Sequence, residues 1–185
     1  LLRDMAERGL AAVQISITTL DPDLARRLEP RASAPRRRLQ ALSELAAAGV
    51  PAGVLVSPLI PGLTDVELER IIEAAANAGA TRAGALLVRL PLEVAGLFEE
   101  WLRSHYPARA DKVLELIRQC RNGRLNDPRF GSRMTGAGPV AELLQQRLAL
   151  ALRRHGLGRR DAGWPLTARH FRRPQLPGTQ LSLFD

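Results

Sequence analysis

Three segments of this sequence carry polar groups directly after a stretch that is typical of a β-strand. Ser16 and Thr18 close the first such stretch, a proline-rich loop at 58–63 follows the second, and Arg89 closes the third. Hydroxyl groups suit a ribose or an amino-acid headgroup, and an arginine fork pairs bidentately with a carboxylate or a phosphate. Structural roles are the alternative: the hydroxyls would cap the next helix, and Arg89 would pair with Glu93.

The elements that must position these groups alternate along the first half of the chain. Apolar, β-branched runs predict strands at 12–18, 53–57 and 83–89. Helical patterns occupy the segments around them, at 2–8, 22–28, 34–48, 64–78 and 91–105. Such alternation predicts parallel βα units, and ligands bind at the carboxyl ends of parallel strands. We therefore expect an α/β fold with three parallel βα units and a ligand site at one edge of the sheet.

Local signals mark where several of these elements begin and end. Asp21 followed by Pro22 predicts an N-cap and a first helical residue. Thr64 with Glu67 three residues later predicts a capping box. The intervening loop at 58–63 is expected to be neither strand nor helix, because it is rich in proline.

The pattern changes after residue 106. Two amphipathic helices are expected at 108–120 and 139–155, with a loop rich in glycine and arginine at 122–138 between them. From residue 156 onward the chain is rich in arginine, proline and glycine, and an extended conformation is predicted. We accordingly divide the chain into an α/β part, a helical extension and an extended tail, at 1–106, 107–156 and 157–185.

Positive charge is concentrated in the second half of the chain. The formal net charge is +8, yet residues 1–100 carry 11 basic and 13 acidic side chains, whereas residues 101–185 carry 16 basic and 6 acidic ones. A coding bias toward arginine would act on both halves, so this asymmetry favours a polyanion such as DNA as a partner of the second half. The alternative is a solvated basic surface without a partner.

Composition excludes several classes of protein. Hydrophobic residues make up 45% of the 185 residues and charged residues 25%, which is typical of a globular domain. No uninterrupted apolar run reaches the roughly 18 residues that a membrane-spanning helix needs. Cys120 is the only cysteine, so the chain by itself forms no disulfide and no cysteine-based metal site. We expect Cys120 to be a packed residue in a protein of the reducing cytoplasm.

Four pieces of the first half occur in an order that resembles a known family. They are ISITTLD at 15–21, LEPRA at 28–32 with Pro35, Arg38 and Leu39 after it, AGVP at 48–51 and SPLIPGLTD at 57–65. In this order they resemble the later part of a radical SAM core, and the likeness is closest to the branch related to spore photoproduct lyase, the DNA repair photolyase-like proteins. The glycine-rich segment from Asn126 to Gly136 is similar to the C-terminal extension of that branch.

The resemblance implies a fold, a reaction and two cofactors. The fold would be the C-terminal part of a partial (β/α) barrel, with the three predicted strands as its last three. Members of the family hold a [4Fe–4S] cluster through a CxxxCxxC loop, bind S-adenosylmethionine to it and generate a 5′-deoxyadenosyl radical. This chain has no CxxxCxxC and begins with Leu1 rather than methionine. We expect the cluster ligands to lie upstream in a longer protein and the chain alone to be inactive.

The resemblance also implies roles for individual residues. S-adenosylmethionine would contact Ser16 and Thr18 through its ribose or aminocarboxyl group, and Glu29 and Arg31 in the connector, where Arg31 would bind the methionyl carboxylate. An ion pair between Arg31 and Glu29 is the structural alternative. The adenine would pack against the backbone of Pro58, Ile60 and Gly62. Residues expected to face a substrate or DNA are Arg89, Asn126 and Arg133.

The carboxyl-terminal residues carry a second resemblance. Gln180, Leu181, Ser182, Leu183 and Phe184 (QLSLF) are similar to the short peptide with which bacterial DNA polymerases and repair proteins dock on the sliding clamp. A glutamine amide and three apolar side chains suit a pocket on such a partner. The hydrophobic tail could instead fold back on its own domain. These features predict a radical SAM enzyme acting on a substrate that could be DNA; the alternative is a catalytically silent adaptor that binds DNA or the clamp.

Overall fold

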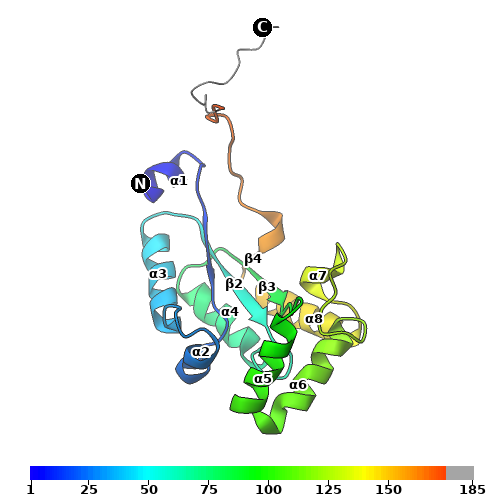
Figure 1. Ribbon diagram of the computed structural model, residues 1–185. Coiled ribbons are helices and arrows are strands. Elements are labelled where there is room, and N and C mark those ends of the chain that lie inside the picture. The colour runs from blue at the N-terminus through cyan, green and yellow to red at the C-terminus, as the bar shows by residue number, and fades with distance from the viewer. Residues whose placement is uncertain (174–185) are drawn as a thin grey trace, which may run out of the picture.

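The computed structural model describes residues 1–173 and has a four-stranded parallel sheet flanked by helices (Figure 1). The strands lie side by side in chain order, as β1 (Val13–Ser16), β2 (Ala52–Leu59), β3 (Arg82–Leu87) and β4 (Gly158–Arg159). The mixed α/β class and the parallel pairing are confirmed. The sheet is open in the described residues, so closure into a partial barrel stays a prediction.

The helices connect and extend these strands. They are α1 (Leu2–Glu7), α2 (Pro22–Leu28), α3 (Pro35–Ala47), α4 (Leu68–Asn77), α5 (Val94–His105), α6 (Pro107–Cys120), α7 (Ser132–Thr135) and α8 (Pro139–Arg154), with short 3-10 turns at Asp65–Glu67 and Arg160–Ala162. None of the helices within residues 1–173 is long and apolar enough to cross a membrane.

One face of the sheet is covered by α3, α4 and α8. Val54 of β2, Ala83 of β3 and Ile17, directly after β1, are fully buried. They form one apolar cluster with Leu42 of α3, four residues of α4 and five of α8. Because side chains alternate across a strand, these residues share one face of the sheet. The helical extension therefore shares its core with the α/β part.

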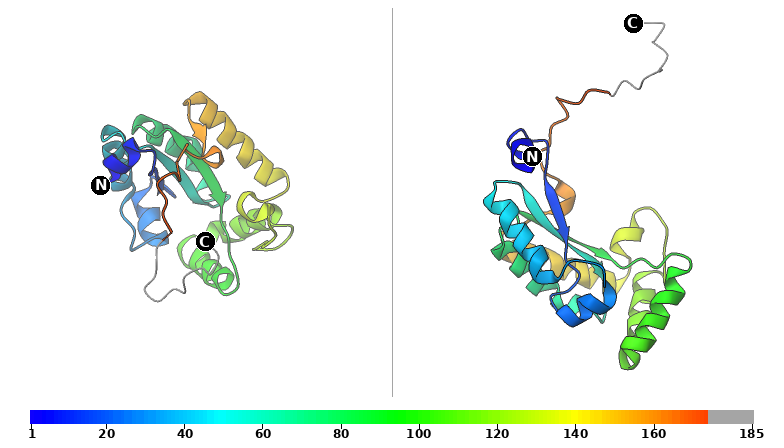
Figure 2. Two further views of the ribbon diagram at one scale, coloured as in Figure 1. Left: turned by 90° about the horizontal axis from the view of Figure 1, so that it is seen from above. Right: turned by 60° about the vertical axis from the view of Figure 1, so that its left-hand side comes forward.

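A second apolar cluster lies at the carboxyl end of the sheet, where α5 and α6 form a hairpin (Figure 2). Ile60 and Val88, each just past a strand, pack there with apolar residues of both helices. The hairpin is joined to α2, since Trp101 Nε1 donates a hydrogen bond of 3.0 Å to the carbonyl of Arg27. This cluster fixes the loops that follow β2 and β3.

The predicted loop at 58–63 begins two residues later than expected, because β2 continues through Pro58 and Leu59. The pairing of β2 with β3 is interrupted between Val56 and Leu59. Proline lacks the N–H that a ladder bond requires, and such an interruption is where a strand tolerates it. The prediction that proline excludes a strand here was therefore wrong.

The predicted capping box at Thr64 and Glu67 is also wrong. The Thr64 hydroxyl accepts a hydrogen bond of 2.8 Å from the Ile60 N–H, and α4 begins only at Leu68. The Glu67 carboxylate instead accepts from the Thr19 hydroxyl and from the Leu20 N–H. Thr64 thus stabilises the loop after β2, and Glu67 stabilises the turn after β1. The N-cap at Asp21 is confirmed.

On the opposite face of the sheet, two glycines leave room for the segment that follows α8. A Cβ at Gly53 would lie 3.1 Å from the Trp164 ring and 2.6 Å from the Arg82 carbonyl oxygen, and one at Gly84 would lie 2.8 Å from Cβ of Arg160. Trp164 Nε1 also donates to Thr81 Oγ1 at 3.2 Å. The segment from β4 to Trp164 therefore packs across the amino-terminal part of the sheet, with glycine leaving the space for it.

This packing predicts the effect of adding one methyl group to β2. Gly53→Ala should destabilise the protein by about 1–3 kcal/mol, because the new Cβ overlaps backbone of β3. Urea unfolding followed by circular dichroism measures the change. Gly96→Ala in α5 is the control: nothing lies within 4 Å of its Cβ position, so it should stabilise the helix by about 0.5–1 kcal/mol. Equal effects of the two substitutions would contradict the close packing.

Candidate functional site

The ends of β1 and β2 are joined by two hydroxyl groups. Ser16 Oγ and Thr18 Oγ1 both donate to the carbonyl oxygen of Ser57, at 2.8 and 2.9 Å. A hydroxyl has one proton, which is used here, and two lone pairs, which remain able to accept. Ser16 is half-buried and Thr18 is buried. The arrangement therefore presents an acceptor at Ser16 for a ligand that carries N–H or O–H groups.

Arg38 of α3 organises the connector that precedes it. Its guanidinium donates to the carbonyls of Ser16 and Ser33, both at 2.8 Å, and lies 3.4 Å from the Glu29 carboxylate. Glu29, Ser33 and Arg38 line a surface pocket of about 250 Å³. Arg38 thus links the end of β1 to the connector, a role that the sequence did not reveal.

Arg31, in the same connector, is exposed and forms no ion pair or hydrogen bond with the residues described. The suggested pair with Glu29 is not formed, because Arg38 takes that carboxylate. The Arg31 guanidinium is therefore available to an anionic group. Its predicted role as a ligand of a carboxylate stays a prediction.

The loop after β2 is held mainly by contacts within the fold. Ile60 is fully buried, and its carbonyl accepts from the N–H groups of Leu63 and Thr64. Gly62 has a φ of 77°, and a Cβ there would lie 3.0 Å from Cδ1 of Leu116 in α6. The absence of a side chain at Gly62 serves packing against α6. Contacts of Pro58, Ile60 and Gly62 with an adenine stay predictions.

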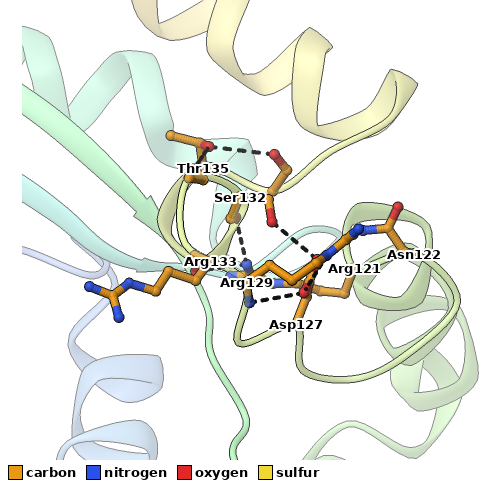
Figure 3. Close-up of polar contacts among 9 residues, drawn as sticks. Arg121, Asn122, Asp127, Arg129, Ser132, Arg133 and Thr135 are labelled. Carbon is orange, nitrogen blue, oxygen red and sulfur yellow. Dashed lines mark hydrogen bonds and ion pairs between the residues drawn. The ribbon is translucent and has the colours of Figure 1, made fainter.

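Arg121 connects the end of β3 to the loop at 122–138. It is fully buried at the end of α6; Nη2 donates to the carbonyls of Leu87 and Val88, at 3.0 and 2.7 Å. Nη1 donates to the carbonyls of Ser132 and Arg133, at 3.1 and 2.7 Å (Figure 3). Burial lowers the pKa of this guanidinium. One side chain thereby fixes four carbonyls from two separate segments.

The buried side chain of Asp127 holds the same loop together through hydrogen bonds (Figure 3). Its buried carboxylate accepts from Asn122 Nδ2, from the backbone N–H and guanidinium of Arg129, and from Ser132 Oγ. The hydrogen bonds from Arg129 hold the pKa of Asp127 well below its usual range. The neighbouring Asn126 is half-buried and its Oδ1 has no partner. The loop is therefore a polar structure built on one carboxylate.

The predicted substrate-facing residues Arg89 and Arg133 lie near this loop. Arg89 is exposed directly after β3 and does not form the suggested ion pair with Glu93. The Arg133 guanidinium extends away from the Asp127 cluster (Figure 3), and its central carbon lies 5.0 Å from the centre of the Phe130 ring. The structure thus places two cations at the end of β3. At the end of β1, Ser57 and Arg38 link Ser16, Thr18 and Glu29, while Arg31 lies in the connector between α2 and α3.

No group of three metal-ligating side chains exists within residues 1–173. Cys120 is buried, and burial raises the pKa of its thiol to about 11. A thiol of this kind stays protonated at neutral pH and is a poor metal ligand. The described residues therefore do not provide the ligands of an iron–sulfur cluster.

The sequence analysis assigned no role to three residues that hold the site together: Arg38, Arg121 and Asp127. Only Arg121 left a usable signal. It falls one turn after Ile117 and two after Val113, on the apolar side of a helix, where a charged residue requires buried partners. Nothing in the local sequence around Arg38 or Asp127 indicates which groups these side chains bond to, because folding alone brings those groups together.

Comparison with known proteins extends this description. The model of the Radical SAM superfamily matches residues 1–75, from α1 into α4. The Uncharacterized protein Rv2578c of Mycobacterium tuberculosis and the Uncharacterized protein Mb2609c of Mycobacterium bovis are each 31% identical to this chain over 121 residues. The match covers 64% of this chain and 36% of each relative, so the chain spans little more than a third of their length. No solved structure matches.

The contacts of Arg121 predict a large loss of stability when they are removed. Arg121→Met should destabilise the protein by at least about 3 kcal/mol, because two buried and two partly buried carbonyls lose a donor. The matched control is Arg118→Gln on the exposed side of the same helix, where the effect should stay within about 0.5 kcal/mol. Urea unfolding measures both. A loss below about 1 kcal/mol for Arg121→Met would contradict the role of Arg121 as the donor that joins β3 to the loop.

Proposed function

We propose that this chain is the S-adenosylmethionine-binding, carboxyl-terminal part of a radical SAM enzyme, and that its basic second half binds nucleic acid. One observation carries the first part. The Radical SAM match ends at residue 75 and thus covers the groups gathered around the ends of β1 and β2. In parallel sheets this edge is where ligands bind.

The residues at this edge have the chemistry that S-adenosylmethionine requires. Ser16 can accept a hydrogen bond from a ribose hydroxyl or from the ammonium group, since its proton is used by the Ser57 carbonyl. The unpaired guanidinium of Arg31 suits the methionyl carboxylate, and Glu29, held by Arg38, adds negative charge near a cationic ligand. Bound to a reduced [4Fe–4S] cluster, S-adenosylmethionine supplies a 5′-deoxyadenosyl radical in this superfamily.

The residues of this chain do not fit a [4Fe–4S] cluster. Its single cysteine cannot supply three thiolate ligands, and that cysteine is buried in a core with a raised pKa. We therefore assign no step of the reaction to residues of this chain. The proposal places the cluster ligands in another part of the whole protein, and it predicts that the 185 residues alone bind S-adenosylmethionine without cleaving it.

The nucleic-acid part of the proposal rests on charge. Arg89, Arg133, Arg153 and Arg154 form no ion pair with described residues, so their guanidinium groups are available to phosphates. A DNA substrate, a role in repair, a lyase reaction and a place in the spore photoproduct lyase branch are the finer parts of this proposal, and the sequence resemblance supports them. A silent adaptor is the competing hypothesis, and it requires no S-adenosylmethionine site.

The proposed docking on a sliding clamp depends on 180–184, which lie outside the described residues. The support is the sequence QLSLF, whose glutamine and apolar residues match the peptides that bind such clamps. A clamp partner is consistent with a protein that acts on DNA.

Binding of S-adenosylmethionine separates the enzyme from the adaptor. The 185-residue chain should bind the labelled compound in equilibrium dialysis, and Ser16→Ala should raise the Kd about 3- to 10-fold, because one hydrogen bond is lost. Ser43→Ala, on an exposed position of α3, is the matched control and should have no effect. If the unaltered chain shows no saturable binding, the adaptor becomes the better explanation.

Clamp docking is tested by the double substitution Leu183→Ala and Phe184→Ala. Loss of two apolar anchors should weaken binding to a bacterial sliding clamp at least tenfold in surface plasmon resonance. Gln175→Ala, upstream of the peptide, should leave the affinity unchanged. Retention of full affinity by the double variant would show that these residues do not carry the interaction.

A further inference from the structure

The loop between α6 and α8 exposes a large aromatic ring. Phe130 is 90% exposed, so its ring contributes almost nothing to the core. The Arg133 guanidinium lies over this ring, 5.0 Å from its centre. One face of the ring is therefore paired with a cation, and the other is available to a planar partner.

The residues on both sides of Phe130 are held in place. Before it, the Asp127 carboxylate accepts from the backbone N–H and guanidinium of Arg129, and after it the same carboxylate accepts from Ser132 Oγ at 3.1 Å. Arg121 then fixes the carbonyls of Ser132 and Arg133. The ring is presented from a loop that is anchored next to it, so little further ordering is needed on binding.

The charge around this ring is positive. Between residues 116 and 141 the only acidic residue is Asp127, and Arg129 neutralises it through hydrogen bonds. Arg124 is exposed without an ion pair among the described residues, and Arg133 faces only the ring. An aromatic ring with one guanidinium group over it, in a loop that carries a second arginine without an ion pair, suits a ligand that combines a flat base with phosphates.

We propose that Phe130 is a stacking platform for an unpaired nucleobase, with Arg133 and Arg124 binding the adjoining phosphates. This inference depends on the nucleic-acid part of the proposed function and specifies it: the substrate strand is single, or locally opened, where it meets this loop. Duplex bases are stacked on their neighbours and offer no free face, which is why an exposed ring selects unpaired ones. The loop adjoins the end of β3, so the base would lie on the side of the sheet where ligands bind.

Fluorescence anisotropy with the 185-residue chain tests the base contact directly. The probes are oligothymidine and a strand of the same length in which every nucleotide is abasic. Phe130→Ala should weaken binding of oligothymidine roughly 5- to 100-fold and leave binding of the abasic strand unchanged. Phe130→Trp should retain the affinity, whereas Phe130→Leu, which keeps the apolar bulk but no ring, should behave like the alanine variant. Leu97→Ala, another exposed apolar position, is the control.

Three outcomes would overturn the inference. Equal losses for the two strands in Phe130→Ala would mean that no base is contacted, although nucleic-acid binding would stand. Equal affinity for a duplex and a single strand would exclude an unpaired base. An absence of binding to every probe at low salt would reject the nucleic-acid part of the proposed function as well. Comparison of oligothymidine with oligouridine then identifies DNA or RNA as the source of the base.

Discussion

The carbonyl groups at the carboxyl ends of the strands are the constraint on which this structure depends. A parallel sheet ends in a row of acceptors, and those that are buried require donors. Arg121 satisfies two carbonyls at the end of β3, and Arg38 satisfies the carbonyl of Ser16 at the end of β1. Two hydroxyls satisfy the carbonyl of Ser57 in β2. Each donor also determines where a neighbouring loop lies.

This arrangement divides the arginines of the site into two groups. Arg38 and Arg121 are buried or half-buried and serve as structural donors, with little left to offer a ligand. Arg31 and Arg89 are exposed, Arg133 is half-buried, and none of the three forms an ion pair among the described residues. Since guanidinium groups of the second kind bind carboxylates and phosphates bidentately, the available positive charge lies at the ends of β1 and β3. The first group positions loops, and the second group is the one to which the proposed function assigns ligand binding.

The helical extension belongs to the same structure as the sheet. Residues of α8 belong to the apolar cluster that covers one face of β1–β3. Residues of α6 belong to the second apolar cluster, which packs against the loops after β2 and β3. Arg147 of α8 also bonds to Asp65 and Glu69, so polar contacts join α8 to the start of α4. The loop that carries Phe130 and Arg133 is therefore attached at both ends to helices of the core. This attachment holds it beside the carboxyl end of β3.

The sequence by itself determined the α/β class, the order of the first three strands and of the longer helices, the parallel pairing and the cap at Asp21, because these follow from local periodicity and short-range signals. It did not predict α7 or the fourth strand, β4, which are too short to show a periodicity. It also singled out Ser16 and Thr18, although their common partner at Ser57 was unknown. Only the tertiary structure decided that Pro58 is part of a strand, that Glu67 binds the turn after β1 and that Arg38 replaces Arg31 as the partner of Glu29. The physical reason is that a side-chain donor or acceptor bonds to whichever group folding brings within about 3 Å, and Arg121 finds carbonyls more than thirty residues away.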